Sequence, residues 1–541
     1  MYSFIQKLFS LFFLVSVTLF ASNHTDSAMI PKPQSIHFTQ GTFVLHKQTV
    51  YQSNTALASK ALSYLKKHLK QHGCSLIPQT QKRERSSISF KYNPKKIKKE
   101  EGYALTITPQ NIHIEARNQA GFFYAVISLM QLMEPLIWSS SREKQYTWRI
   151  PACSLFDYPQ YAWRGLMLDC SRNFFSKTYV KKFIDRMAQY KLNRFHWHLT
   201  DDEGWRIEIK AYPLLTQIGA KRGPHTKLPF STFPAMRGAK NRVQSGYYSQ
   251  KEIQEIVAYA KARCIEILPE IDIPAHAKAA IVSYPHLLQE KADKSQYRSV
   301  QRIHNNTLNP ALPNTYIFLD HVLSEVSQLF PFDYIHLGGD EVPKGAWKDS
   351  PAVKNYMKTK HLKNKRAVEN DFFYRMDTLL ARYGKKMVVW QEVASAQAKL
   401  RKSTLFMAWK SKKSGVNALK AHRNTIMAPV EYLYFDQQYI RSKKEYGHTW
   451  STPISTQKTY SFNPSHSRYL KGVEACLWSE TLLNEKIADY LTWPRALALS
   501  EVAWTAQKKR HWKSFRQRVL KRGLPSLKIQ KIHYRPFQKR K

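Results

Sequence analysis

Two adjacent carboxylates follow two glycines in the segment His336-Leu337-Gly338-Gly339-Asp340-Glu341. Glycine relaxes the backbone at the end of a strand. Neighbouring residues in an extended chain point in different directions, so Asp340 and Glu341 can address different parts of one substrate. Carboxyl groups are suited to proton transfer. The pair is therefore a candidate acid–base centre, although a solvated surface loop is an equally good interpretation of this segment taken alone.

Acids, histidines and tryptophans gather toward the ends of eight short apolar runs. These runs are WRGLMLD (163–169), RFHWHLT (194–200), IEILPEID (265–272), DYIHLGGDE (333–341), KMVVWQE (386–392), STLFMAWK (403–410), NTIMAPV (424–430) and GVEACLWSE (472–480). Amphipathic stretches separate them, and the stretch Ser249–Arg263 begins with the capping-box pair Ser249 and Glu252. Alternating strands and helices predict a closed (β/α)8 TIM barrel, which carries its chemistry at the carboxyl ends of its strands.

The rest of the 541-residue chain predicts further units around the barrel. Residues 30–155 alternate strand-like runs (FVLHKQTVY, YALTITPQNIHIEA) with helical ones (ALSYLKKHLKQHG, AGFFYAVISLMQLMEPL), which indicates a smaller, non-catalytic α/β domain. We assign residues 156–507 to the barrel domain. The final residues, 508–541, are expected to pack on the barrel.

The amino terminus is typical of a secretion signal. Lys7 is followed by a predominantly apolar region of 13 residues, Leu8–Phe20, and by the small residues Ala21 and Ser22. This run is short for a membrane span, so we expect a signal peptide over residues 1–22 and export, to the periplasm or the exterior in a bacterium. An uncleaved membrane anchor is the alternative.

The formal net charge is +46, and residues 508–541 hold 14 Lys and Arg and no acid. Such a charge favours nonspecific association with anionic polymers or surfaces. The basic residues are spread along the chain and no nucleic-acid-binding module is recognisable, so we expect no dedicated nucleic-acid site. The five cysteines are widely spaced and predict buried free thiols, neither a disulfide framework nor a zinc site.

The motifs WRGLMLD, FHWHLTDD, LPEIDIPAH, HLGGDE and LWSE, in this order along the chain, resemble glycoside hydrolase family 20, the β-N-acetylhexosaminidases. The resemblance covers roughly residues 30–535. It implies an exo-acting, retaining hydrolase of terminal N-acetylglucosamine or N-acetylgalactosamine in oligosaccharides or glycoconjugates. In this family the acetamido oxygen of the substrate attacks the anomeric carbon, which gives an oxazolinium intermediate. No metal or organic cofactor is expected.

The resemblance also assigns roles to residues. Glu341 would be the general acid, Asp340 would orient the acetamido group, and Tyr434 would donate a hydrogen bond to its oxygen. Asp201 and His276 would support Glu341 through hydrogen bonds. The family usually has Gly where Ala275 precedes His276, so the added methyl group puts the position of His276 slightly in doubt.

The same resemblance predicts the residues that hold the sugar. Arg164, Asp436 and Glu480 would bind its hydroxyls, with Arg164 and Asp436 at the 3- and 4-positions. Three tryptophans would form an aromatic box around the acetamido methyl and the apolar sugar face. They are Trp390, Trp409 and Trp478.

Two other functions stay open at this point. His196 and His198 have the His-x-His spacing of some metal-dependent barrel hydrolases, although the rest of a ligand set is incomplete. A catalytically silent sugar- or polymer-binding protein is the second alternative, and it would be expected to have lost part of the catalytic set.

Overall fold

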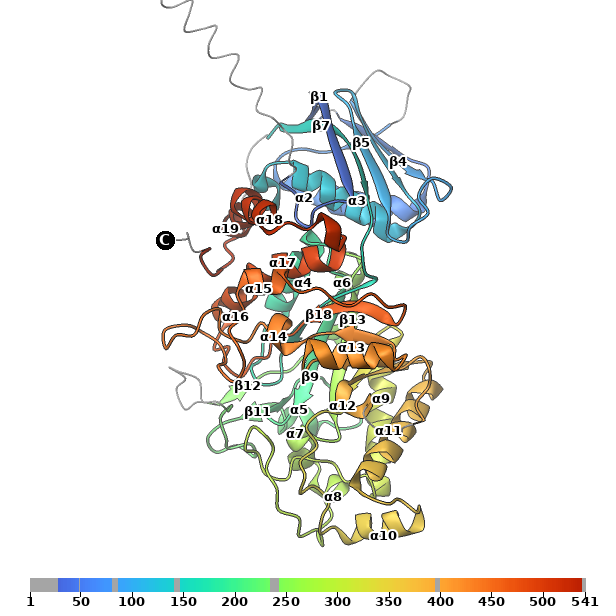
Figure 1. Ribbon diagram of the computed structural model, residues 1–541, viewed down its shortest axis with the longest axis vertical. Helices are drawn as coiled ribbons and strands as arrows, with labels where there is room; N and C mark the ends of the chain where they lie inside the picture. Colours follow the sequence, from blue (N-terminus) through green and yellow to red (C-terminus); the bar gives the residue numbers. More distant parts are fainter. Residues whose placement is uncertain are drawn as a thin grey trace, which may run out of the picture.

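The computed structural model describes residues 28–47, 49–79, 86–140, 146–233, 243–394 and 399–537. The predicted signal peptide lies outside these residues. The described chain forms a seven-stranded sheet followed by a parallel barrel, with the C-terminal helices beside both (Figure 1). Among the described residues, no helix combines the length and apolar composition needed to cross a bilayer.

The N-terminal sheet has the order β1-β7-β5-β6-β4-β2-β3. Its strands are β1 (Ser35–Leu45), β2 (Val50–Ser53), β3 (Ile77–Pro78), β4 (Ser87–Tyr92), β5 (Tyr103–Ile107), β6 (Asn111–Ala116) and β7 (Trp148–Asp157). The run predicted as FVLHKQTVY is not one strand, because the backbone turns between β1 and β2, where Thr49 N–H donates to His46 O over 3.0 Å. The polar residues His46 and Thr49 lie at this turn.

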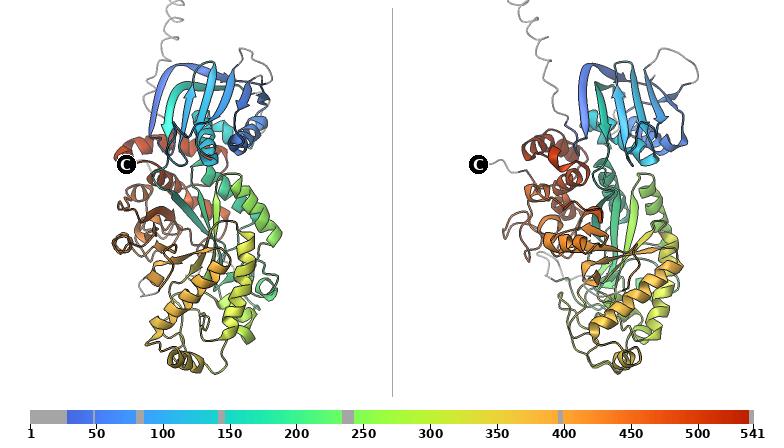
Figure 2. Two further views of the ribbon diagram at one scale, coloured as in Figure 1. Left: turned by 90° about the vertical axis from the view of Figure 1, so that its right-hand side faces the viewer. Right: turned by 45° about the vertical axis from the view of Figure 1, so that its right-hand side comes forward.

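Two helices cover the face of the sheet that looks toward the barrel, α2 (Ser59–Gln71) and α3 (Gln119–Leu132) (Figure 2). Asn118 caps α3, and nearly every residue of this helix is buried. Tyr124 of α3 packs edge-on against Trp504 of α17 (Arg495–Trp504), with 5.1 Å between ring centroids. Because α3 contacts the sheet on one side and the barrel helix on the other, it joins the two parts through apolar packing.

All eight predicted runs are strands of one closed barrel. The strands are β8 (Trp163–Asp169), β9 (Arg194–Asp201), β13 (Glu266–Ile273), β14 (Tyr334–Gly338), β15 (Lys386–Trp390), β16 (Leu405–Ala408), β17 (Thr425–Met427) and β18 (Leu470–Ala475). Each pairs in parallel with the next, and β18 returns to β8, which also pairs with β9. The (β/α)8 prediction and the smaller preceding α/β domain are therefore confirmed.

Helices surround the barrel. They are α4 (Lys177–Gln189), α6 (Gln250–Lys261), α9 (Pro313–Leu329), α11 (Lys365–Arg382), α13 (Lys412–Lys420), α16 (Glu485–Thr492) and α17, and shorter helices such as α7 (Lys278–Ser283), α10 (Pro351–Thr359), α12 (Gln391–Ala394), α14 (Val430–Leu433) and α15 (Thr456–Tyr460) occur in the connections. The predicted capping box of α6 is present: the Ser249 and Glu252 side chains each accept a hydrogen bond from the other residue's backbone.

The C-terminal residues pack against both parts of the molecule. Arg518, in α18 (Trp512–Arg518), forms an ion pair with Glu501 of α17 and donates to Met29 O. Arg522 donates to Met133 O, just after α3. The segment therefore touches the N-terminal part as well as the barrel. All five cysteines are free thiols, and four of them are buried.

Candidate active site

A cavity of about 300 Å³ opens among the residues that follow the barrel strands. Eight of the eleven predicted site residues line it: His276, Asp340, Glu341, Trp409, Tyr434, Asp436, Trp478 and Glu480. Six other residues complete the lining: Arg172, Phe233, Val300, Gln301, His448 and Trp450. The pocket thus gathers residues from widely separated stretches of the chain.

The backbone after β14 takes a left-handed path that aims the two acids. The φ angles are +63° at Gly338, +94° at Gly339 and +51° at Glu341. A Cβ on Gly338 would lie 1.7 Å from Oδ1 of Asp272, and one on Gly339 would lie 2.5 Å from Cγ2 of Val393. Both glycines are therefore required for conformation and for space, and they let Asp340 and Glu341 reach the same cavity.

His276 stands behind the acid pair. Its Nε2 lies 3.5 Å from Oε2 of Glu341 and 3.8 Å from Oδ2 of Asp340, and its Nδ1 lies 3.0 Å from Oδ1 of Asp201. Although burial alone would lower the pKa of His276, Asp201, Asp272 and Asp340 raise it well above its usual value. The ring is therefore an imidazolium at neutral pH. Ala275 is buried beside it and does not prevent these contacts.

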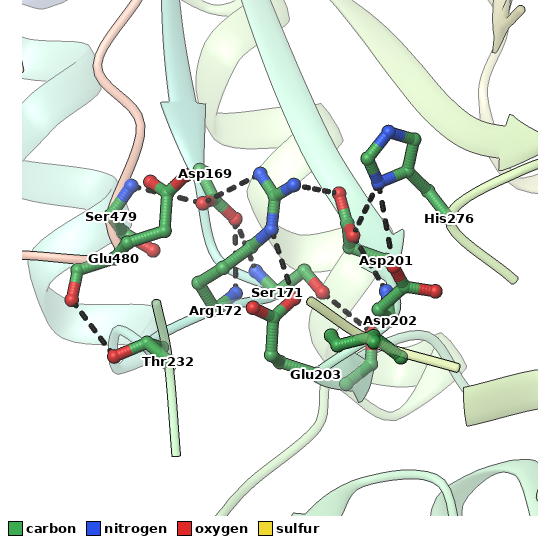
Figure 3. Close-up of polar contacts among 12 residues, drawn as sticks. Asp169, Ser171, Arg172, Asp201, Asp202, Glu203, Thr232, His276, Ser479 and Glu480 are labelled. Atoms are coloured by element: carbon green, nitrogen blue, oxygen red, sulfur yellow. Dashed lines mark hydrogen bonds and ion pairs between the residues drawn. The ribbon is translucent and has the colours of Figure 1, made fainter. Parts of the chain in front are cut away.

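Asp201 does not line the cavity but anchors His276 from behind. It also contacts Arg172 Nη2 at 2.6 Å and His198 Nε2 at 2.9 Å. Burial would raise its pKa, but the nearby charges of Arg172 and His276 hold the pKa of Asp201 far below its usual range. Figure 3 shows Asp201 between the two cations, where it stays ionised and fixes both.

The acid pair retains a proton more tightly than two isolated carboxyls would. Burial raises the pKa of Asp340 to about 8, His276 opposes the shift, and the negative charge of Glu341 adds to it. Two neighbouring carboxylates in a buried site resist double ionisation. Below about pH 8 the two adjacent carboxyls therefore carry one proton between them.

The arginine in the pocket is Arg172, not Arg164, which corrects the prediction. Arg164 lies at the amino end of β8, fully buried, where it pairs with Glu101 at 2.6 Å and donates to Tyr124. Arg172 follows the carboxyl end of the same strand. Because barrel chemistry gathers at the carboxyl ends of the strands, position after residues 163–169 was the signal that would have identified Arg172.

Arg172 organises the polar wall of the pocket. Its guanidinium contacts the carboxylates of Asp169, Asp201 and Glu203 at 3.4, 2.6 and 3.2 Å (Figure 3). Burial would lower its pKa, but this set of acids raises the pKa of Arg172 well above its usual value. Its charge also helps to keep Glu480, on the same wall, ionised.

Aromatic rings line another part of the cavity. Trp409 stacks on Tyr434, with ring centroids 5.8 Å apart and an interplanar angle of 18°. Trp478 lies 6.3 Å from Tyr434, and Trp450 meets Tyr434 edge-on at 6.2 Å. Such faces suit the apolar face of a sugar and an acetamido methyl group.

Trp390 is the second correction. It is 1% exposed, lies beneath Trp478 with 5.8 Å between ring centroids, and donates through Nε1 to Glu270 Oε1 over 2.9 Å. It supports the box rather than lining it. Trp450, from the connection between β17 and β18, is the third tryptophan of the pocket. Five lining residues follow no periodic pattern in the sequence that could have identified them: Trp450, Phe233, His448, Val300 and Gln301.

The His-x-His pair lies inside the barrel. His196 contacts Glu474 and Glu270, at 2.7 and 3.0 Å, and His198 contacts Asp201. Groups such as His196, Glu270 and His336 are close enough to share a metal ion. Their carboxylates are nevertheless engaged with imidazoles, so charge pairing within the barrel also accounts for them.

A parallel barrel with a carboxyl pair and an aromatic wall at its strand ends defines the class of glycoside-processing barrel enzymes. Residues 161–507 match the family model described as "Glycosyl hydrolase family 20, catalytic domain", and residues 26–158 match "Glycosyl hydrolase family 20, domain 2". The chain belongs to glycosyl hydrolase family 20 and is a hydrolase of the β-hexosaminidase type.

Individual relatives agree with this assignment. A β-hexosaminidase of Vibrio furnissii is 35% identical over 489 residues, which cover 88% of this chain and 77% of the relative. A β-N-acetylhexosaminidase of Cellulomonas fimi is 30% identical and covers 91% of this chain and 93% of the relative. The crystal structure of a GH20 exo-β-N-acetylglucosaminidase from Vibrio harveyi, in complex with N-acetylglucosamine, superposes with a TM-score of 0.87 at 35% identity, covering 94% of this chain and 78% of that one.

Proposed function

We propose that this protein is an exo-acting, retaining β-N-acetylhexosaminidase that uses the acetamido group of its substrate as the nucleophile. The observation that carries the proposal is the placement of Asp340, Glu341 and Tyr434 around one aromatic-walled cavity. The substrate class, a glycan with a terminal β-linked N-acetylhexosamine, is supported by the relatives named above.

In the first step Glu341 protonates the glycosidic oxygen while the acetamido oxygen attacks the anomeric carbon. The bond to the leaving group breaks, and an oxazolinium ion forms within the sugar. The Asp340 carboxylate accepts a hydrogen bond from the acetamido N–H and stabilises the positive charge that develops on this nitrogen. The Tyr434 hydroxyl donates a hydrogen bond to the acetamido oxygen. His276, held by Asp201, keeps Glu341 in position.

In the second step Glu341, now a carboxylate, removes a proton from water as the water attacks the same anomeric carbon. Two successive inversions retain the β configuration. Asp436 and Glu480 bind the ring hydroxyls together with Arg172, while Trp409 and Trp478 enclose the acetamido methyl. A cavity of about 300 Å³ suits one terminal sugar, which agrees with exo action.

Two variants test the mechanism on aryl β-N-acetylglucosaminides. Glu341→Gln should lose about 10²–10⁴-fold in kcat with a poor leaving group. It should lose much less with a dinitrophenyl leaving group, which needs no protonation. Asp340→Asn should fail with both substrates, because the internal nucleophile is no longer positioned.

The matched control is Asp333→Asn. Asp333 lies just before the amino end of β14, and its side chain is 64% exposed. This variant should keep wild-type kinetics. Wild-type rates in both site variants would reject the assignment of the acid pair.

We also propose that the chain is exported through its N-terminal signal and that its basic surface associates with anionic polymers without sequence or base specificity. Fractionation of cells that express the full chain tests the first point. Retention on an anionic resin, released by salt in proportion to ionic strength, tests the second.

A further inference from the structure

His448 lines the pocket, and the reaction proposed above gives it no role. It lies in the connection between α14 and α15 and is 5% exposed. Its backbone fixes it there: the His448 N–H donates to Asp436 O over 2.7 Å, and Gln438 N–H donates to His448 O over 3.0 Å. Because the anchoring bonds are made by the backbone, the side chain can be replaced without releasing the loop.

The imidazole faces Glu480 across a gap. Nε2 of His448 lies 3.5 Å from Oε2 of Glu480, which is close enough for charge attraction and long for a hydrogen bond. Within the described residues, both atoms are buried without a hydrogen-bond partner, and so is Oδ1 of Asp436. Leaving a buried polar atom unsatisfied costs about 1–3 kcal/mol, so three such atoms on one pocket wall indicate a polar ligand group.

The distance between His448 Nε2 and Glu480 Oε2 allows one hydroxyl group to form a hydrogen bond with both atoms. An oxygen placed about 2.8 Å from each of two atoms that are 3.5 Å apart forms an ordinary hydrogen-bonded triangle. A hydroxyl both accepts and donates, so it can accept from the His448 N–H and donate to the Glu480 carboxylate. An ether oxygen or a methyl group in the same place could not satisfy both partners.

The charges around this gap support the same arrangement. Burial opposes the ionisation of Glu480, but Arg172 and His448 lower its pKa to about 2. Burial would also lower the pKa of His448, but Glu480 and Asp436 raise it, against the opposing charge of Arg172. Glu480 is therefore an acceptor and His448 favours its donor form near neutral pH, and hydrogen bonds to charged groups are the strong ones.

We infer that His448 is a positioning and specificity-determining residue that, together with Glu480, binds the 4- or 6-hydroxyl of the terminal sugar. This inference rests on the proposed function for the identity of the ligand. The inference assigns to His448 the binding of a sugar hydroxyl that is remote from the glycosidic bond that breaks.

The test combines two variants with substrates that lack single hydroxyls. His448→Phe keeps a ring but removes the donor, and His448→Gln keeps a donor. On an aryl β-N-acetylglucosaminide we expect His448→Phe to raise KM about 10- to 100-fold, as for a lost charged hydrogen bond, with kcat within about threefold of wild type. His448→Gln should recover part of the loss.

The 4-deoxy and 6-deoxy substrates provide the decisive comparison. For one of these two deoxy substrates, wild type and His448→Phe should have the same KM, because that substrate lacks the hydroxyl that His448 binds. An equal increase in KM on all three substrates, or no increase at all, would overturn the inference. His466→Gln, at an exposed histidine outside the pocket, is the matched control and should leave KM unchanged.

Calorimetric binding of N-acetylglucosamine to the same proteins separates this inference from the proposed function. A wild-type protein that binds the sugar but releases no aryl group would reject the function, and the affinity of His448→Phe would then decide on His448 alone. A wild-type protein that neither binds nor hydrolyses the sugar would overturn both.

Discussion

His276 Nε2 lies 3.5 Å from Oε2 of Glu341, and Asp201 holds the other nitrogen of the same ring at 3.0 Å. This line of contacts connects a fully buried carboxylate to Glu341, the proposed proton donor at the cavity wall. It fixes the imidazolium so that it faces the acid pair. In the proposed reaction, a buried cation beside the two acids would also limit the negative charge that builds up when Glu341 gives away its proton.

Asp201 and His276 should therefore act as one unit. Asp201→Asn and His276→Asn should each lower kcat by roughly 100-fold, because a misplaced acid costs about that much, while KM changes little. The double variant should lose no more than the worse single variant. Steady-state kinetics of the three proteins measure this, and fully multiplicative losses would show that the two residues act separately.

The pH dependence follows from the proton held by the acid pair. Burial and Glu341 raise the pKa of Asp340 to about 8, so the proton is present below this pH and is lost above it. We expect kcat/KM to fall as pH rises through about 8.

The pH profile is measured with an aryl substrate that has a poor leaving group, and a dinitrophenyl substrate serves as the control. The fall should be weaker with the control, which needs no acid. A value of kcat/KM for the poor leaving group that stays constant from about pH 7 to about pH 9 would contradict the shared-proton interpretation.

The acetamido arm should be indispensable. Replacing N-acetylglucosamine by glucose in an aryl β-glycoside removes the internal nucleophile, and intramolecular attack provides effective molarities of about 10⁵–10⁸ M. We expect kcat/KM to drop at least about 10⁴-fold, measured as release of the nitrophenol. Rapid hydrolysis of the simple β-glucoside would exclude the substrate-assisted mechanism.

Arg164 in β8 and Arg172, which follows this strand, should separate stability from binding. Arg164→Met removes the arginine that pairs with Glu101 beneath the barrel, so the free energy of unfolding should fall by roughly 3 kcal/mol while KM stays close to wild type. Arg172→Lys keeps the charge but loses the planar fork, so kcat/KM should fall about 10- to 100-fold. Urea unfolding and kinetics on both variants measure the contrast, and a KM defect in Arg164→Met would restore the earlier assignment.

Metal dependence can be tested directly. Exhaustive chelation should leave the activity unchanged, because imidazoles in the barrel are paired with Glu270, Glu474 and Asp201. Loss of activity that returns with one divalent ion would favour the metal-dependent alternative.

Much of the fold could be predicted because its signals are local. Each barrel strand is a short apolar run with polar residues at its end, and the capping box of α6 is contained within four residues. The segment before Asp340 and Glu341 holds both glycines that the left-handed turn requires. These features depend on neighbours in sequence, so the sequence alone determined the barrel and the position of the acid pair on it.

Only the tertiary structure decided which other side chains reach the cavity. All seven residues of β8 are buried, so no alternation along the strand shows that Arg164 turns toward Glu101 while Arg172, beyond the strand end, enters the pocket. Trp450 and His448 come from a long connection that is held in place by backbone contacts with residues near Asp436. Such contacts join parts of the chain whose spacing has no period, and therefore only the folded chain shows that Trp450, and not Trp390, lines the cavity.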